Sequence, residues 1–472
     1  MRVLRPALLT SAAVLGLLTG CAVGPDYRKP APETPPAFAE AAAAPEAPWQ
    51  AAAPKDHLPK GAWWTIYRDP VLDRLAQQAT DASPTIQAAV ARRDQARYTA
   101  RIDGADAFPA LAVNADASRS RTAPNRRTGS PAFTSDSFSL PLDLSYELDL
   151  WGRVRRTRES AGARAEAAEA DYHNVLLGVQ ADVVRGYFAL RALDVERAVL
   201  VRTVESRRRS STIIGRQVAL GAVGQLDASL AETDLATAEG LLVAIDQSRT
   251  GLRHGLAVLC GQLPESFTLD ADPAPLAAPP AIPLGLPSEL LERRPDVATA
   301  ERTLASASAQ IGVAKAAFFP AVTLFGSVGY NSTSAGSLLD WSSRVWSIGP
   351  GISLPIFQGG RNTANYQRAQ AAYDEAFADY RQDVLVAFQE VETALSDVRR
   401  LAERDVLAAR AVAASRRAAD IVQQRYRAGQ VGYLDVTDAE RTALANESLA
   451  IQLRGQQLVA SVVLVKALGG GW

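Results

Sequence analysis

The chain has 472 residues, a formal net charge of −1 and a mean hydropathy of −0.05, and 47% of its residues are hydrophobic. The near-neutral charge argues against nucleic acid as a partner, because nucleic-acid-binding surfaces need an excess of Lys and Arg. Two cysteines and three histidines are too few for a disulfide scaffold or a Cys/His zinc cluster, so no metal site is expected.

The first 20 residues have the features of a secretory signal peptide. Arg2 and Arg5 precede a short apolar run, Ala7–Leu18, which is too brief to span a membrane comfortably. The run ends in Leu18-Thr19-Gly20-Cys21, which resembles a bacterial lipobox. We therefore expect cleavage after Gly20 and a covalent lipid on Cys21, and no other cofactor. An ordinary signal peptide with a coincidental cysteine is the alternative.

Residues 21–60 are expected to form a lipidated N-terminal tether. Residues 22–60 hold nine prolines, many alanines and few large apolar side chains, a composition typical of extended linkers. Such a tether would let the body of the protein sit at some distance from its lipid anchor.

The placement of the prolines outlines two similar halves. No proline occurs in 143–263 or in 356–472. A Phe-Pro-Ala corner begins at Phe108 and again at Phe319, and a Gly-x-x-Gly-x-Leu-Asp motif begins at Gly221 and again at Gly429. A period near 210 residues is too long for a solenoid unit and indicates two fused copies of one domain. We place the first repeat at 61–263, a Pro-rich connector at 264–287 and the second repeat at 288–472.

Each copy is expected to contain short helices followed by two strands. The helices are interrupted at Ser83-Pro84 and at Arg294-Pro295, because proline disfavours a continuous helix. Ser137–Leu150 alternates strictly between polar and apolar residues, over more than the usual strand length of about five or six. With its weaker partners, this pattern predicts strands at about 109–120, 137–150, 320–331 and 345–357.

The proline-free tracts are expected to form long helical hairpins. From Phe377 to Leu401 apolar residues recur every three or four positions, as in a coiled-coil seam, and a similar series runs from Tyr172 to Leu193. Each tract is interrupted once by a pair of glycines, at Gly221 and Gly224 or at Gly429 and Gly432. The outgoing arms, roughly 153–219 and 360–428, would each be about 100 Å long.

The amphipathic strands suit a membrane sheet. After Cys21 no run of 18 residues is continuously apolar, so no membrane-spanning helix is expected. A sheet in lipid cannot keep open edges, and four strands are too few to close into a barrel, so oligomerisation is expected. Two chains would supply eight strands and three would supply twelve. Half-buried strands of a soluble sheet are the alternative.

The whole mature chain resembles the TolC-like outer-membrane factor family, in particular its OprM/NodT-type efflux lipoproteins. The residues that carry the resemblance are Cys21-Ala22-Val23-Gly24-Pro25-Asp26-Tyr27, Phe108-Pro109, Leu291-x-Arg293-Arg294-Pro295-Asp296, Phe318-Phe319-Pro320, Leu354-Pro355-Ile356-Phe357, Tyr426-x-x-Gly429, Leu434-Asp435-Val436 and Lys466-Ala467-Leu468-Gly469-Gly470-Gly471-Trp472.

The resemblance implies a mainly α-helical protein with a membrane β-barrel portion. It implies a homotrimer with a twelve-stranded barrel in the outer membrane, four strands from each chain, and a long α-helical barrel in the periplasm. The function implied is the exit duct of a tripartite efflux pump, with a periplasmic adaptor and an inner-membrane pump of the RND type as partners. A type I secretion duct and a structural envelope lipoprotein without channel activity are the alternatives.

An enzyme is not expected, because no catalytic constellation is visible. His57, His173 and His254 lie far apart in sequence, and neither a nucleophile motif nor a phosphate-binding glycine loop is present.

The candidate gate is Leu434, Asp435 and Asp438, just after the second hairpin turn. The two carboxylates are three residues apart and share a helical face, whereas the first repeat has Leu230 where the second has Asp438. The simpler interpretation is that these are acids at a helix N-terminus, stabilised by the helix dipole. The resemblance instead places this turn at the periplasmic tip, where three-fold symmetry would bring six carboxylates near one axis.

The resemblance assigns supporting roles to other residues of the tips. It puts Tyr426 and Asp227 in position for hydrogen bonds that close the gate, with Val431 where a family relative has an arginine. It also implies that the adaptor contacts the turns that contain Gly221, Gly224, Gly429 and Gly432.

Overall fold

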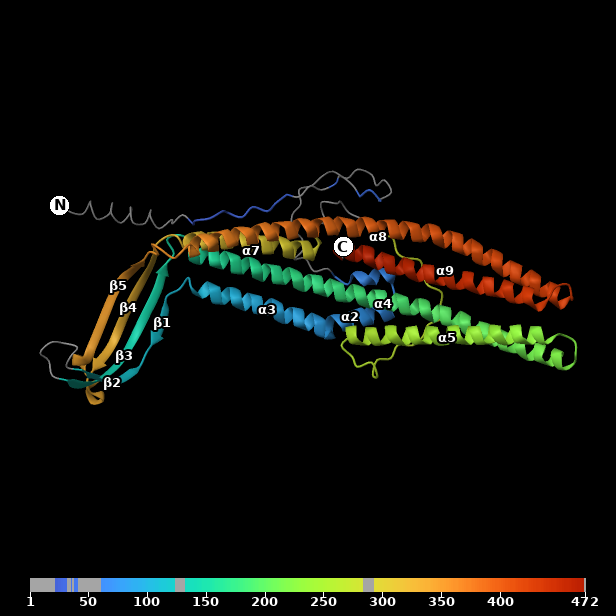
Figure 1. The fold of residues 1–472 in the computed structure, drawn as a ribbon, viewed down its shortest axis with the longest axis horizontal. Coiled ribbons are helices and arrows are strands. Elements are labelled where there is room, and N and C mark those ends of the chain that lie inside the picture. The colour runs from blue at the N-terminus through green and yellow to red at the C-terminus, as the bar shows by residue number, and fades with distance from the viewer. Residues whose placement is uncertain are drawn as a thin grey trace. The chain divides into compact units, whose positions relative to one another are not determined.

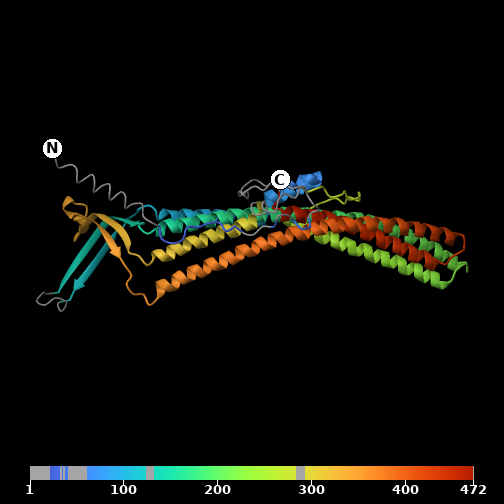
Figure 2. The same cartoon turned by 90° about the horizontal axis from the view of Figure 1, so that it is seen from above.

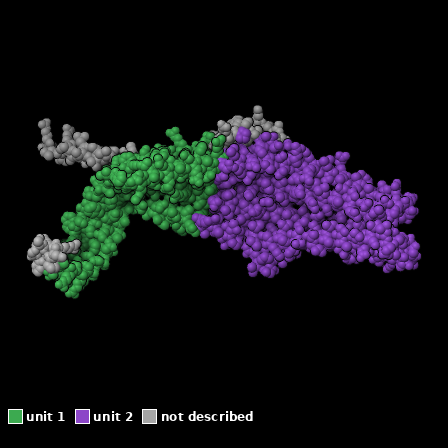
Figure 3. All heavy atoms as spheres, viewed as in Figure 1, with its two compact units in different colours: residues 1–31, 93–169, 299–381 green, residues 32–92, 170–298, 382–472 purple. Residues whose placement is uncertain are grey.

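The structure is a computed structural model that describes residues 22–31, 35, 38–40, 61–123, 132–282 and 293–470. Cys21 lies outside the described residues, so its lipidation stays a prediction. The chain divides into two compact units, each built from segments of both halves of the sequence (Figure 3). Unit 1 comprises 1–31, 93–169 and 299–381, and unit 2 comprises 32–92, 170–298 and 382–472.

The helices come in pairs of equal length. Helices α3 (Pro84–Ala105) and α7 (Pro295–Ala316) have 22 residues each, and both begin with the proline that interrupts the preceding segment. Helices α4 (Arg153–Ala219) and α8 (Arg361–Arg427) have 67 residues each, within one residue of the predicted arms. Helices α5 (Gln225–Leu259) and α9 (Tyr433–Ala467) have 35 residues each and return along α4 and α8 (Figures 1 and 2).

The predicted fold class, mainly helical with long hairpins and an amphipathic sheet, is confirmed. The order from α3 to α5, a helix, strands and two long helices, occurs again from α7 to α9, but the boundaries assigned to the repeats and to the connector stay predictions. The stretch between α3 and α4, residues 106–152, is three residues longer than its counterpart between α7 and α8, residues 317–360.

Unit 1 contains an antiparallel sheet of five strands. Strand β3 (Phe133–Leu148) pairs with β1 (Ala110–Val113) and β2 (Asp116–Thr122) on one side and with β4 (Ala321–Ser332) on the other, and β4 pairs with β5 (Arg344–Ser353). Three of the four predicted strands are found close to their expected ranges. The fourth, at 109–120, is broken in two, and the strand expected at 345–357 ends at Ser353.

Both differences between the predicted and the observed strands follow from backbone hydrogen bonding. Strands β1 and β2 share one register on β3, and the residues between them lie opposite Pro141, whose ring nitrogen cannot donate to the ladder. Ser353 is the partner of Ala321, the first residue of β4, so the chain beyond Ser353 has no strand to pair with.

The sheet has one apolar and one mainly polar face. Cross-strand pairing puts Leu142, Val328 and Trp346 in one row on the apolar face. On β5 this face is open to the surroundings, since Trp346 is 77% exposed and Ile352 is 71% exposed. The polar face carries the serines of β3 and the acids Asp143 and Glu147. A single chain therefore leaves apolar strand residues uncovered.

Residues 22–31 are docked rather than free, which corrects the expectation of a tether for this part of the chain. Gly24 has φ +104° and approaches Gly312 so closely that a Cβ on Gly24 would lie 2.5 Å from the Gly312 Cα. Asp26 forms an ion pair of 2.6 Å with Arg156, whose side chain is 6% exposed. The Tyr27 hydroxyl donates a hydrogen bond to the Glu301 carboxylate. The first segment after the expected anchor thus lies against α4 and α7.

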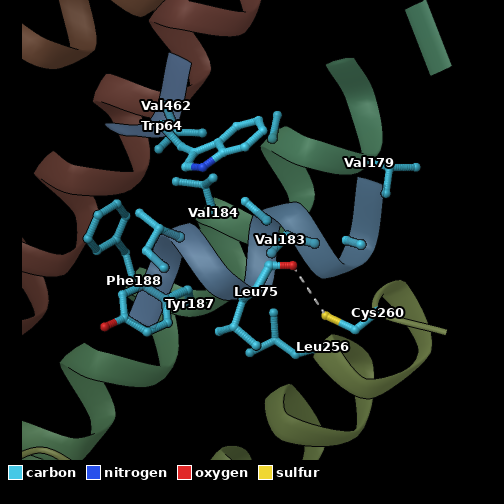
Figure 4. Packing of buried hydrophobic residues seen from close by; sticks show 14 of the residues in the cluster. Trp64, Leu75, Val179, Val183, Val184, Tyr187, Phe188, Leu256, Cys260 and Val462 are labelled. Carbon is cyan, nitrogen blue, oxygen red and sulfur yellow. Dashed lines mark hydrogen bonds between the residues drawn. The ribbon is translucent and has the colours of Figure 1, made fainter. Parts of the chain in front are cut away.

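Unit 2 contains the main hydrophobic core (Figure 4). The 3₁₀ helix η1 (Trp63–Tyr67) and helix α2 (Pro70–Ala82) pack Trp64 and Leu75 against Val183 and Val184 of α4. Burial raises the pKa of Cys260 to about 11, and its thiol donates to the Leu75 carbonyl at 3.7 Å, as for a core cysteine.

Helix α9 is long and apolar enough to cross a membrane by length and composition, but half of its apolar stretch is buried. Leu458, Val462 and Val465 of this helix belong to the core of unit 2. Its apolar composition is therefore accounted for by packing within the protein.

Gly329 offers a test of the sheet. It lies opposite Pro141, and a Cβ there would come within 2.3 Å of the Leu140 carbonyl oxygen. Gly329→Val should therefore lower the stability of the sheet by about 1–3 kcal/mol, measured as the thermal unfolding temperature of the purified protein. Gly326→Ala on the same strand is the control, because the nearest atom to its Cβ is at 3.8 Å. Equal unfolding temperatures for the two variants would contradict this packing.

Candidate functional site

The two hairpin tips are built alike. Gly221 and Gly429 both have φ +71°, a conformation that glycine adopts without strain. In the second tip the Gly429 amide donates to the Tyr426 carbonyl at 2.9 Å and the Gln430 amide donates to the Arg425 carbonyl at 2.9 Å. The first tip has the matching pair of bonds, so both outgoing helices end in a Schellman motif. Gly224 and Gly432 have negative φ and serve as N-caps of the returning helices.

The three candidate gate residues lie together on one exposed side of the first two turns of α9. Leu434 is 53% exposed, and Asp435 and Asp438 are exposed as well. Tyr433 and Val436, on the other side of these turns, are buried. The sequence-predicted arrangement of one apolar and two acidic side chains on a common surface is thus present in the chain.

The two acids have different partners. The Asp435 carboxylate accepts a hydrogen bond of 3.0 Å from the Gly432 amide and so caps the helix. The Asp438 carboxylate lies 3.8 Å from the Arg441 guanidinium, and both side chains are more than 60% exposed. Asp435 therefore has a local structural role, and Asp438 is the freer of the two.

Tyr426 packs into a small apolar cluster that joins the two tips. Its ring lies 5.8 Å from that of Tyr433, and the cluster includes Ile214 and Ala231 of the first hairpin. Burial and the negative charge of Asp227 raise the pKa of Tyr426, so Asp227 is nearby. Within the described part of the chain no hydrogen bond joins Tyr426 to Asp227, and the predicted closing bond stays a prediction.

A charged network that the sequence interpretation missed connects the hairpins just above the tips. Asp234 of α5 is 5% exposed, and its carboxylate accepts a hydrogen bond of 3.2 Å from Arg441 of α9. The Asp234 backbone carbonyl accepts a bond of 2.8 Å from the buried Arg207 of α4. One signal was available in the sequence, since Asp234 lies between Ala231 and Ala238 on the buried stripe of α5.

Glu440 and Arg207 line a cavity of about 240 Å³ beside this network. Burial raises the pKa of Glu440 and Asp234 raises it further, whereas the positive charge of Arg207 partly lowers it. Burial and Glu440 together raise the pKa of Tyr433 to about 12. Burial thus favours the neutral forms of Glu440 and Tyr433 beside the charged network.

The described residues contain no group of three or more His, Cys, Asp or Glu side chains placed to hold a metal ion.

Comparison with known proteins identifies the family. The family model "Outer membrane efflux protein" matches residues 75–262 and 286–470. The chain is 34% identical to outer membrane protein OprJ of Pseudomonas aeruginosa over 492 residues, with 99% of this chain and 97% of OprJ covered. It is 34% identical to the pyoverdine export outer membrane protein OpmQ of Pseudomonas putida, with 91% of this chain and 92% of OpmQ covered.

The solved structures that match this chain are also outer-membrane channels. The outer-membrane channel OprN matches with a TM-score of 0.86 and 34% identity, over 96% of this chain and 100% of OprN. The open state of the Neisseria gonorrhoeae MtrE outer membrane channel matches with a TM-score of 0.81 and 30% identity, over 96% of this chain and 98% of MtrE. The chain belongs to the outer membrane efflux protein family and is an outer-membrane channel protein with a large periplasmic portion, as the sequence resemblance implied.

Gly429→Ala tests the tip geometry. A side chain in the left-handed region costs about 1–2 kcal/mol, so this variant should loosen the turn. Hydrogen exchange at the end of α8 and the start of α9 should become faster than in the wild type. Gly432→Ser is the matched control, because Gly432 has φ −82° and serine is a good N-cap. Faster exchange in the control than in Gly429→Ala would contradict the geometry.

Glu440→Gln tests the charge dependence of the hairpin contact. Because the pKa of Glu440 is raised in the folded protein, its stabilising effect is fully present below the ordinary value of 4.5 and is lost as the pH rises through the folded pKa. The unfolding temperature of the wild type should therefore fall relative to that of Glu440→Gln as the pH rises from about 4.5 to neutrality. The exposed Glu232→Gln should show no such trend, and a constant difference for Glu440→Gln would refute the effect.

Proposed function

We propose that the chain is the exit duct of a tripartite efflux pump, which conducts small molecules passively to the exterior as a homotrimer. Family membership supports the channel function, and the architecture of one chain supports the assembly. The sheet supplies a membrane part and the two hairpins supply a periplasmic part.

The two unpaired edges of the sheet are the main support for this proposal. In the described chain β1 and β2 form one edge and β5 forms the other, and neither edge pairs with a further strand. Unpaired edge amides and carbonyls cost several kcal/mol each in lipid, and the exposed apolar face suits lipid rather than water. Three copies, each with β1 and β2 counted as one broken strand, would close a barrel of twelve strands. The polar face would then line the lumen.

The hairpin tips would meet the adaptor, and an inner-membrane pump of the RND type would lie beyond it. Gly221, Gly224, Gly429 and Gly432 shape the turns that the adaptor would contact. The lipid on Cys21 would anchor the chain in the outer membrane. The relatives carry names that refer to pyoverdine export and to cation efflux, so a shared duct fold serves different cargoes, and we assign none to this chain.

The resting channel would be held shut by rings of Leu434, Asp435 and Asp438 from three copies. Like charges near one axis attract cations and oppose each other's ionisation. Engagement of the tips by an adaptor would move these side chains away from the axis.

Asp435→Asn combined with Asp438→Ala tests the gate. The asparagine keeps an oxygen for the Gly432 amide, and the alanine removes the carboxylate that lies near Arg441. Single-channel conductance in planar bilayers should rise because the constriction widens and its ion pair is lost. Asp420→Ala, an exposed acid on α8, is the control and should conduct like the wild type. Unchanged conductance in the double variant would exclude these residues from the gate.

The duct itself is tested with the wild-type protein. Purified trimers should conduct ions in liposomes, whereas a scaffold lipoprotein should not. A monomeric wild-type protein that gives no conductance would overturn the proposed function.

A further inference from the structure

The apolar face of the sheet changes to arginine at the end where β2 leads to β3 and β4 leads to β5. On β2 the last apolar pair on this face is Ala117 with Phe138, and two residues further on Arg119 pairs with Asp136. Arg121 follows on the same face. On β5, Arg344 lies two residues before Trp346, again on this face. We call Arg119, Arg121 and Arg344 the basic rim.

The arginines of the basic rim can still bind a further anion. Arg119 reaches Asp136 at 3.4 Å, but its side chain remains 76% exposed. The Arg344 guanidinium stacks on the ring of Trp341 and donates from Nε to the Trp341 carbonyl at 2.9 Å. Stacking leaves the edge of the guanidinium free to donate further bonds. Among the described residues, one ion pair is formed by these three arginines, that of Arg119 with Asp136.

The opposite face at the same end carries hydroxyls instead of charge. Ser118 and Ser120 alternate with the two arginines of β2, and the Ser120 hydroxyl lies 3.4 Å from that of Ser135. Arginines that served the cargo would lie on this polar face. They lie instead on the face that continues the apolar band, next to Trp341, which is 74% exposed. Tryptophan beside an apolar band is typical of the boundary between lipid tails and headgroups.

Closure of the sheet into a barrel would bring the basic rims of neighbouring copies together. Arg119 and Arg121 belong to one edge of the sheet and Arg344 belongs to the other. In a closed oligomer the β5 edge of one copy runs beside the β2 edge of the next, so the arginines of two copies would flank each seam. Arginine forks match the oxygens of a phosphate group and bind it with charge-assisted bonds.

We propose that the basic rim binds phosphorylated glycolipid headgroups of the outer leaflet at each seam between copies. The inference rests on the proposed function, because it requires the apolar face to lie in lipid. It assigns the channel a specific lipid contact that is separate from the lumen and from the gate.

The test uses purified wild-type trimers and the triple variant Arg119→Gln, Arg121→Gln, Arg344→Gln, with diphosphorylated lipid A as the probe in native mass spectrometry. Binding to the triple variant should weaken at least about tenfold, as expected for the loss of charge-assisted bonds. Dephosphorylated lipid A should bind wild type and variant equally weakly. The matched control, Arg404→Gln, Arg410→Gln, Arg417→Gln on the exposed side of α8, should bind like the wild type.

Three outcomes would overturn the proposal. These are equal binding of lipid A to wild type and triple variant, equal binding of both lipids to the wild type, or displacement of lipid A by inorganic phosphate at the same concentration. Arg344→Gln alone should give an intermediate loss, which keeps the test decisive if the triple variant does not assemble. Conductance of the wild type is measured in parallel without lipid A, and its absence would count against the duct rather than against headgroup binding.

Discussion

The need to pair the backbone groups of a sheet in lipid governs this chain. In the described strands the ladder from β2 to β5 is continuous, and its two edges are the places where one chain cannot satisfy its own amides and carbonyls. The apolar face also has to be covered by something outside the chain, because Trp346, Ile348 and Ile352 are each at least 70% exposed. Pro141 has no amide hydrogen to donate, and the strand opposite it is broken into β1 and β2. On the other side of β3, the position opposite Pro141 has room only for a glycine, Gly329.

Buried polar contacts fix the ends of the long helices in unit 2. Arg294, just before α7, is 6% exposed and donates to the carbonyl of Ala467 at the end of α9 at 3.1 Å. It also pairs with Asp296 and with Glu390 of α8. A buried arginine of this kind is costly to leave unpaired, so the start of one element and the end of another are held in one place. The Arg293-Arg294-Pro295-Asp296 motif therefore contacts the end of α9, where a Cβ on Gly469 would lie 2.9 Å from the backbone of Arg293.

Local periodicity was sufficient to predict most of the fold. The proline-free tracts gave α4 and α8 to within a residue, and the alternation from Ser137 predicted β3, because these signals depend only on neighbours along the chain. The break opposite Pro141 depends on cross-strand register, which the sequence does not contain. The docking of Gly24 and Asp26 was hidden for a similar reason, since linker composition does not reveal a partner 130 residues away. At the tips the glycines and the acids were visible as motifs, whereas the link from Asp234 to Arg441 arises only when the two hairpins pack.

The equal lengths of the paired helices have an evolutionary consequence. Two tandem copies in one polypeptide give the periplasmic end a pseudo-repeat, yet the copies are free to diverge because each is encoded separately. Leu230 in the first copy and Asp438 in the second occupy equivalent positions with opposite polarity. Gene fusion thus allows the two hairpins of one chain to carry different side chains at equivalent positions, which identical single-copy chains could not do.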